Sequence, residues 1–268
     1  HDEAEFLYLL SPLSRVIGYI INDYLEEMAK TIYDYWFVQF DFPDENGKPY
    51  KSSGGEMIYT DGHIIPNGWK ICKMQDIISS VCTGLNPRDN FSLGSGNIKY
   101  ITVKNLTTNG TLDFTGCDTI DESARTIVHN RSDIQIGDVL FASIAPLGRC
   151  YLIQAEPTDW DINESVFSIR ANIGVVTPTF LYLYFMSDAF IKQATSNSTG
   201  SIFKGIRINT LLDTELCVPP LSVIIQFENK LASTLPLKSK SCEEIQKLTN
   251  LRDWLLPMLM NGQATIED

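Results

Sequence analysis

Reactive residue types occur throughout this sequence, but their spacing forms no recognisable catalytic motif. Residues 200–205 (GSIFKG) contain glycine and lysine without the order of a phosphate-binding loop. Residues 217–220 (CVPP) lack the amide or carboxylate before the prolines, and the aromatic residue after them, that a base-flipping methylation site requires. Neighbouring carboxylates such as Asp159 and Asp161 are typical of a solvated surface. We therefore expect a chain that is not an enzyme by itself and that uses no cofactor.

The cysteine and histidine residues do not indicate a metal site either. The six cysteines are scattered and form no C-x-x-C pair, and the three histidines are His1, His63 and His129. A Cys/His zinc site is therefore not expected. Scattered thiols are typical of a reducing cytoplasm, where we place the protein. No apolar run approaches the ~20 residues of a membrane span, so no membrane partner is expected.

The formal net charge of −12 argues against a nucleic-acid partner, but the charge is unevenly distributed. Residues 1–63 contain 4 basic and 12 acidic side chains, residues 64–220 contain 12 and 15, and residues 221–268 contain 5 and 6. The acidic charge is thus concentrated in the N-terminal segment. Because phosphates respond to the local potential, the nearly neutral middle segment can still present a basic face.

A similar apolar pattern occurs twice, once near each end of the chain. LEEMAKTIYDYWF at residues 25–37 aligns with LTNLRDWLLPMLM at residues 248–260, and six positions stay apolar while the residue identities change. Equivalent helix faces behave in this way, because packing constrains polarity and spacing more than identity. Two ordinary amphipathic helices that match by chance are the alternative. A globular segment between two such helices is more typical of a scaffold or a reader than of a stand-alone enzyme.

Each tract predicts a long helix with an apolar stripe of coiled-coil character. The first is expected over residues 12–38, with Ser11 as N-cap and Pro12 at the first helical position. The second is expected within residues 221–268, where Pro236 either kinks the helix or marks the meeting of two helices. We expect the two stripes to pack on each other, or on their copies in a second molecule. The stripe residues are Ile17, Ile20, Tyr24, Met28, Ile32 and Tyr35 on the first helix, and Ile245, Leu248, Leu251, Leu255 and Met258 on the second.

Short strands and turns replace the helical pattern between the two tracts. Runs rich in β-branched and aromatic residues favour strands, and the apolar stretch after Pro178 favours a helix. The predicted fold class is α+β, with one mixed, strand-rich domain over residues 64–220 between flanking regions 1–63 and 221–268. The first flanking region also contains an Asn46-Gly47 turn and a linker. The predicted strands are 98–103, 138–143, 150–155, 165–170 and 215–218, and the predicted helix is 179–194.

Short motifs over nearly the whole chain carry a resemblance to a known family. They are residues 25–55, 65–69 (IPNGW), 137–140 (GDVL) followed by Ser143, 199–201 (TGS) followed by Lys204 and Ile206, 218–221 (VPPL) with Gln226, and Leu255-Leu256 with Asn261-Gly262. In this order and spacing they resemble the specificity (S) subunit of type I restriction-modification systems. Residues 25–55 resemble the central constant region of that subunit, and the motif at 65–69 resembles the opening of its target-recognition domain.

The resemblance implies a non-catalytic subunit that recognises DNA. Its target-recognition domain would read half of a bipartite target in double-stranded DNA. Its helices would set the distance to the other half-site and dock the methyltransferase (modification) subunits, with indirect contact to the restriction/translocase subunit. The complex that it joins would be a DNA adenine methyltransferase and ATP-dependent endonuclease. This sequence departs from the family pattern in two ways. It has one recognition domain rather than two, which implies either a half-subunit able to form a homodimer or the C-terminal half of a longer chain. In addition, Pro236 interrupts the distal helix.

The resemblance also suggests which side chains contact DNA. Polar or basic residues on turns and exposed strand ends are the natural candidates for phosphate anchoring and base-edge readout. Tyr100 and Phe203 are further possibilities that more often belong to a core. A helical assembly scaffold without DNA binding, and an enzyme with an unrecognised site, are the alternatives. The candidate DNA-binding residues are Lys99, Lys104, Asn105, Arg149, Ser201, Lys204, Arg207 and Asn209.

Overall fold

A computed structural model describes residues 12–144, 147–196, 205–232 and 234–261 of the chain. These residues belong to two compact units. We call His1–Ala29 with Leu231–Asp268 the helical unit, and Lys30–Lys230 the mixed unit. In the described parts of both units, no helix is long and apolar enough to cross a membrane.

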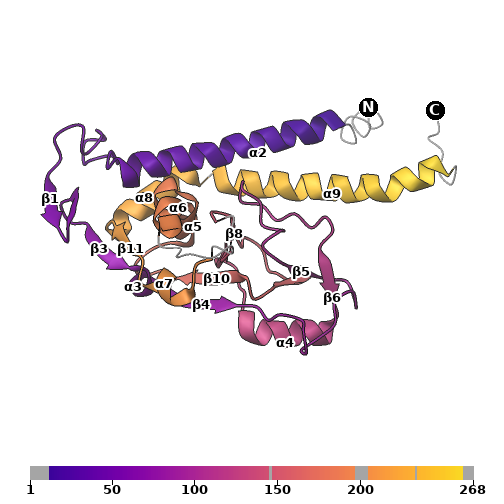
Figure 1. Cartoon of the computed structure of the whole chain (residues 1–268). Helices are drawn as coiled ribbons and strands as arrows, with labels where there is room; N and C mark the ends of the chain where they lie inside the picture. Colours follow the sequence, from indigo (N-terminus) through magenta and orange to yellow (C-terminus); the bar gives the residue numbers. More distant parts are fainter. Residues whose placement is uncertain (1–11, 145–146, 197–204, 233, 262–268) are drawn as a thin grey trace. The chain divides into compact units, whose positions relative to one another are not determined.

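The helical unit consists of most of α2 (Pro12–Tyr33) and all of α9 (Thr234–Met260), which run antiparallel to each other (Figure 1). Gly18 of α2 faces Ile245 of α9 so closely that an added Cβ would lie 2.8 Å from Ile245 Cδ1. Glycine inside a helix lowers helix stability by roughly 1 kcal/mol relative to alanine. Here the missing side chain lets the isoleucine of the facing helix pack against the α2 backbone.

The buried face of α2 differs from the face expected to pack. Asn22 and Glu26, which follow Gly18 at one-turn intervals, are only 2% and 4% exposed. By contrast Ile17, Ile20, Tyr24, Met28 and Tyr35 are exposed, Tyr24 by 68%, and Ile32 is half-buried.

The expected stripe of α9 is partly buried. Ile245 is buried, Leu248, Leu255 and Met258 are half-buried, and Leu251 is exposed. The sequence-based prediction chose the wrong face of α2 because it followed the large apolar residues. The contact with α9 includes Gly18 instead, where the missing side chain allows a close approach. Packing of the exposed face on a second molecule stays a prediction.

Pro236 stands near the start of a separate helix. The helix α8 (Leu221–Leu231) ends before it, and α9 begins at Thr234. A proline in the first turn of a helix removes no hydrogen bond, since the first N–H groups have no intrahelical partner. Of the two alternatives for Pro236, the structure therefore has two helices. The last turn of α9 contains Pro257, whose carbonyl accepts a hydrogen bond from the Asn261 N–H at 3.0 Å.

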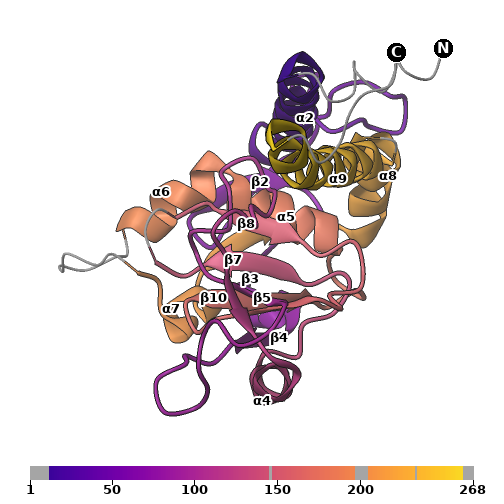
Figure 2. The ribbon, with the colours of Figure 1, turned by 90° about the vertical axis from the view of Figure 1, so that its right-hand side faces the viewer.

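A four-stranded antiparallel sheet forms the centre of the mixed unit. Its order is β4 (Ile78–Thr83), β10 (Val166–Ala171), β7 (Val139–Ala142) and β8 (Cys150–Leu152). The helices α5 (Pro178–Met186) and α6 (Asp188–Ser196) replace the single helix predicted over 179–194. Residues 180–186 of α5 are all buried, and α5 packs on β8, β7 and β10 (Figure 2).

A three-stranded sheet lies beside it, in the order β6 (Asp118–Ile120), β5 (Ile98–Ile101) and β9 (Trp160–Ile162). The strands β5 and β9 are parallel. Because side chains alternate along a strand, Ile98 and Tyr100 join one apolar cluster with α4 (Glu122–Ser132), and Ile101 joins a second cluster on the other face. Asp121 is the N-cap of α4, and its carboxylate accepts a hydrogen bond from the Ala124 N–H at 2.8 Å.

Two two-stranded antiparallel sheets complete the mixed unit, together with the π-helix η1 (Asp34–Val38) and the short helices α3 (Met74–Ile77) and α7 (Ile208–Leu212). The strand β1 (Met57–Thr60) pairs with β2 (His63–Pro66), and β3 (Lys70–Lys73) pairs with β11 (Glu215–Val218). The domain boundary expected near His63 thus falls inside the β1–β2 hairpin. Helices with largely antiparallel sheets make this an α+β fold, which confirms the predicted class.

Candidate nucleic-acid interface

Loops from four distant parts of the sequence meet where β5, β7 and β9 end. The Asn163 N–H donates to the Ile101 carbonyl at 2.8 Å, which joins the ends of β9 and β5. Ser143 after β7 donates to the Ser165 carbonyl through its N–H at 3.0 Å and through its hydroxyl at 2.7 Å. The Ile206 N–H in turn donates to the Ser143 carbonyl at 2.8 Å. We call this set of segments, residues 102–105, 143–144, 147–149, 163–165 and 205–207, the loop edge.

Lys104 lies on a tight turn within the loop edge. The Asn105 N–H donates to the Thr102 carbonyl at 3.0 Å and closes the turn around Val103 and Lys104. Lys104 is exposed, whereas Asn105 is only 6% exposed. The Asn105 carboxamide accepts from the Thr102 N–H at 2.9 Å and donates to the Asp113 carbonyl at 2.8 Å. The turn therefore presents a lysine to solvent and keeps its asparagine inside.

Arg149 approaches the same turn from the start of β8. Its Nη1 donates to the Val103 carbonyl at 3.3 Å. Its Nε is buried and has no hydrogen-bond partner among the described residues. Arg149 is half-buried, so much of the guanidinium is directed at protein rather than solvent.

Arg207 is the last residue of the loop edge, and Asn209 follows it in the first turn of α7. Both are exposed, and Arg207 is the N-cap residue of α7. The antiparallel bridge between Ile144 and Gly205 holds this segment against the end of β7. The loop edge thus carries two exposed cationic residues, Lys104 and Arg207, from segments about a hundred residues apart in sequence.

The other predicted contact residues are placed elsewhere or not described. Lys99 is half-buried in the middle of β5, between Thr119 of β6 and Trp160 of β9. Tyr100 is a buried core residue whose hydroxyl donates to the Leu85 carbonyl. Ser201, Lys204 and Phe203 lie outside the described residues.

The family model of the type I restriction modification DNA specificity domain matches residues 66–247 of this chain, a range that includes the whole loop edge. The chain belongs to this family. It is 19% identical over 253 residues to the MjaIX specificity subunit of Methanocaldococcus jannaschii, covering 92% of this chain and 54% of that protein. It is 21% identical over 321 residues to the HindI specificity subunit of Haemophilus influenzae, covering 97% of this chain and 67% of that protein. The chain thus spans about half the length of the first of these relatives.

A solved structure with a TM-score above 0.5 has a similar fold. The S subunit from M. genitalium superposes with a TM-score of 0.53 at 12% identity, covering 94% of this chain and 57% of that one. The HsdS subunit from Thermoanaerobacter tengcongensis gives a TM-score of 0.46 at 14% identity, covering 97% of this chain and 57% of that one.

A polar loop that sequence reasoning missed follows the Lys104 turn. Leu106 and Leu112 form an antiparallel bridge, and Thr107 and Thr111 exchange hydrogen bonds between them. The hydroxyls of both threonines donate to Asn109 Oδ1, at 2.6 and 3.0 Å. The alternation of threonine and asparagine around Gly110 is a turn signal that marks this loop in the sequence. In this chain, it extends the loop edge with neutral hydrogen-bonding groups.

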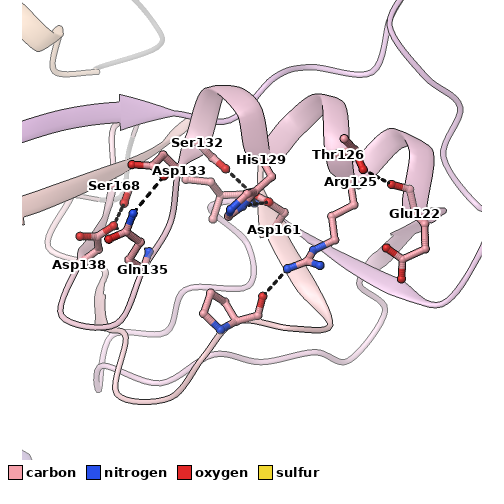
Figure 3. A network of polar contacts seen from close by, with 12 residues as sticks. Glu122, Arg125, Thr126, His129, Ser132, Asp133, Gln135, Asp138, Asp161 and Ser168 are labelled. Atoms are coloured by element: carbon pink, nitrogen blue, oxygen red, sulfur yellow. Dashed lines mark hydrogen bonds and ion pairs between the residues drawn. The ribbon is translucent and has the colours of Figure 1, made fainter.

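A second polar network connects α4 to the sheets (Figure 3). Asp161 is fully buried and accepts from the Ser132 hydroxyl at 2.6 Å, while His129 Nδ1 lies 3.1 Å from its other oxygen. Burial raises the pKa of Asp161, and the hydrogen bond from Ser132 opposes this effect. A serine, a carboxylate and a histidine are present, but the serine donates to the carboxylate and not to the histidine. The histidine does not accept from the serine hydroxyl, so this network stabilises the fold and does not resemble a hydrolase triad.

Arg170 of β10 joins the end of α4 to the start of β7. Its Nε donates to Asp138 Oδ1 at 2.7 Å and its Nη1 to Asp133 Oδ2 at 3.1 Å. Hydrogen bonding to Asp138 raises the pKa of Arg170 above its ordinary value. This cation is neutralised by protein carboxylates and is not available to a phosphate.

Proposed function

We propose that this chain is the DNA-recognising component of a type I restriction-modification complex and has no catalytic activity of its own. It would read one half of a bipartite target and dock methyltransferase subunits. Membership of the DNA specificity family supports this proposal, as do the names of the two curated relatives, both called type I restriction enzyme specificity subunits.

The loop edge is the observation that carries DNA recognition. Loops at the ends of several strands come together there, and Lys104, Arg207 and Asn209 are exposed on or beside it. Lysine and arginine anchor phosphates, whereas asparagine can read adenine through its amide. The net charge of −12 does not argue against this, because only the local potential around the loop edge acts on the duplex at physiological salt.

The exposed face of α2 is the best candidate for docking a protein partner. Val16, Ile17, Ile20, Ile21, Tyr24 and Met28 are large apolar residues that remain exposed in the single chain. Burying one such side chain contributes about 1.5–3 kcal/mol, so covering the face would contribute on the order of 10 kcal/mol before association entropy is subtracted. A modification subunit or a second copy of this chain would supply the covering surface.

A helical scaffold without DNA binding is the second candidate function. The overall acidity and the exposed apolar face of α2 favour it. Heparin retention and binding to a random-sequence duplex separate the two functions, because only a DNA reader loses affinity steeply as salt rises between roughly 50 and 200 mM.

The full test uses the chain together with its modification subunit. The methylation pattern of the host genome should contain a bipartite motif that depends on this chain. If deleting its gene leaves every methylated motif unchanged, the recognition function is rejected. If the duplex is bound but no modification subunit co-purifies, only the docking part is rejected.

A further inference from the structure

The turn that carries Lys104 is held from two sides, by the buried side chain of Asn105 and by the half-buried side chain of Arg149. Asn105 belongs to the turn and is almost fully buried. Its Oδ1 accepts from both the N–H and the hydroxyl of Thr102, at 2.9 and 3.1 Å. Its Nδ2 donates to the Asp113 carbonyl at 2.8 Å, which ties the turn to the far side of the polar loop. Because Asn105 is buried and its carboxamide is bonded to the turn on both sides, it is not placed to read a base.

Arg149 holds the turn from a different strand. It donates to the carbonyl of Val103, the residue directly before Lys104. Its Nε is buried and has no hydrogen-bond partner among the described residues, so the guanidinium is held inside the protein and acts on the turn through Nη1.

The cationic side chains of this region form no ion pair with a described residue, although two exposed carboxylates, Asp113 and Glu164, lie on neighbouring segments. In the described part of the chain, no carboxylate lies within ion-pair distance of Arg149 or Lys104. Arg170, by comparison, is paired with two aspartates. Lys104 on the turn and Arg149 behind it are therefore not neutralised by an ion pair, and the exposed ammonium group of Lys104 can bind an anion.

We propose that Lys104 is a phosphate contact of the loop edge, and that Asn105 and Arg149 are positioning residues that act through it. The proposal rests on the proposed DNA-binding function. The ligand is a backbone phosphate of duplex DNA. Because the turn is already ordered, binding loses less backbone entropy than it would at a mobile lysine, and Lys104 has a defined position on the duplex.

A double-mutant cycle tests these roles, with the full chain and a random-sequence duplex measured between roughly 50 and 200 mM salt. Lys104→Gln should reduce the slope of log K against log salt by about 0.9, which lowers the affinity ratio between the two salt limits about 3.5-fold. Arg149→Met should weaken binding by a similar factor in the wild-type background. In the Lys104→Gln background it should have no further effect, because its action passes through the lysine. Asn105→Ala should show the same dependence on Lys104.

Lys70→Gln is the matched control, since Lys70 is an exposed lysine on β3, outside the loop edge. Lys104→Arg should retain the slope. Circular dichroism and thermal melting show whether Arg149→Met and Asn105→Ala remain folded, and Lys104→Gln removes only an exposed side chain.

Three results overturn the proposal. If Lys104→Gln behaves like Lys70→Gln while the wild type binds with salt sensitivity, Lys104 is not a contact and only this inference fails. If the Arg149 and Lys104 effects add and the slope falls by about twice 0.9, Arg149 is itself a phosphate ligand. If the wild-type chain shows no salt-sensitive binding, alone or with its modification subunit, the inference fails together with the proposed function.

Discussion

Replacing Gly18 by alanine tests the contact between α2 and α9 directly. The new methyl group would lie 2.8 Å from Ile245 Cδ1 and 3.1 Å from Ile245 Cγ1. Alanine gains roughly 1 kcal/mol of helix propensity over glycine. Overpacking a filled contact costs typically 1–3 kcal/mol. Since the clashing atom is the end of a side chain that can partly move, we expect Gly18→Ala to destabilise the chain by about 1 kcal/mol overall.

The Ile245→Val substitution removes the methyl group that causes most of the conflict. By itself it should destabilise by about 0.5–1.5 kcal/mol. In this background Gly18→Ala should become stabilising by up to about 1 kcal/mol, since only the propensity gain is left. The expected coupling free energy between the two sites is therefore about 1–2 kcal/mol.

Urea unfolding of the four chains measures this coupling. Thr31→Ala is a control, because Thr31 is an exposed residue of α2 and its effect should not depend on Ile245. If Gly18→Ala stabilises the wild type by the full propensity difference and is insensitive to Ile245→Val, then Gly18 does not face Ile245 and the reasoning is refuted.

Other predictions concern DNA binding, catalysis, partner docking and pH. Arg207→Ala, with Lys204→Ala, should weaken duplex binding and flatten its salt dependence; unchanged affinity across roughly 50–200 mM salt would sink the basic face. Purified chain with S-adenosylmethionine, or with Mg²⁺ and ATP, should leave DNA unaltered, and turnover that survives repurification would show otherwise. Met28→Asp together with Leu251→Asp should abolish docking of the modification subunit, measured by pull-down, while circular dichroism shows that the mixed unit stays folded. Undiminished docking would contradict this prediction. Hydrogen bonds from the Ser123 hydroxyl and the Ala124 N–H lower the pKa of Asp121, so its contribution to stability is present above about pH 4 and is lost as the pH falls further. Asp121→Asn should therefore reduce the fall of the melting temperature at acid pH. An unchanged fall would show that Asp121 does not stabilise α4 as its N-cap.

Local sequence patterns were sufficient to predict several elements of the fold. The strand predicted over 215–218 has the bounds of β11, and the apolar runs around β5, β7, β8 and β10 mark those strands. The Asn46-Gly47 turn is present with Gly47 at a positive φ of 74°. The helix predicted over 12–38 corresponds to α2 followed directly by the π-helix η1, and its predicted N-cap Ser11 lies outside the described residues. These elements depend on propensities and turn conformations of neighbouring residues, which a short window of sequence contains.

The helix α4 shows where this local signal is weak. It has few apolar residues, and only Ala124, Val128 and Ser132 are buried. Its N-cap Asp121 and the basic residues of its last turn were the available signals. A periodicity search passes over such a helix because most of its surface is solvated.

The sequence alone determined the family resemblance, the α+β class and a set of polar residues that could meet DNA. Only the tertiary structure distinguished their roles. An asparagine and a lysine adjacent in sequence, Asn105 and Lys104, have opposite burial because the turn directs one carboxamide at backbone groups and leaves the other side chain in solvent. The loop edge depends on strand register and on contacts between segments about a hundred residues apart, and the close approach at Gly18 depends on which face of α2 meets α9. Such long-range contacts are chosen by packing of the whole chain, and no local pattern encodes them.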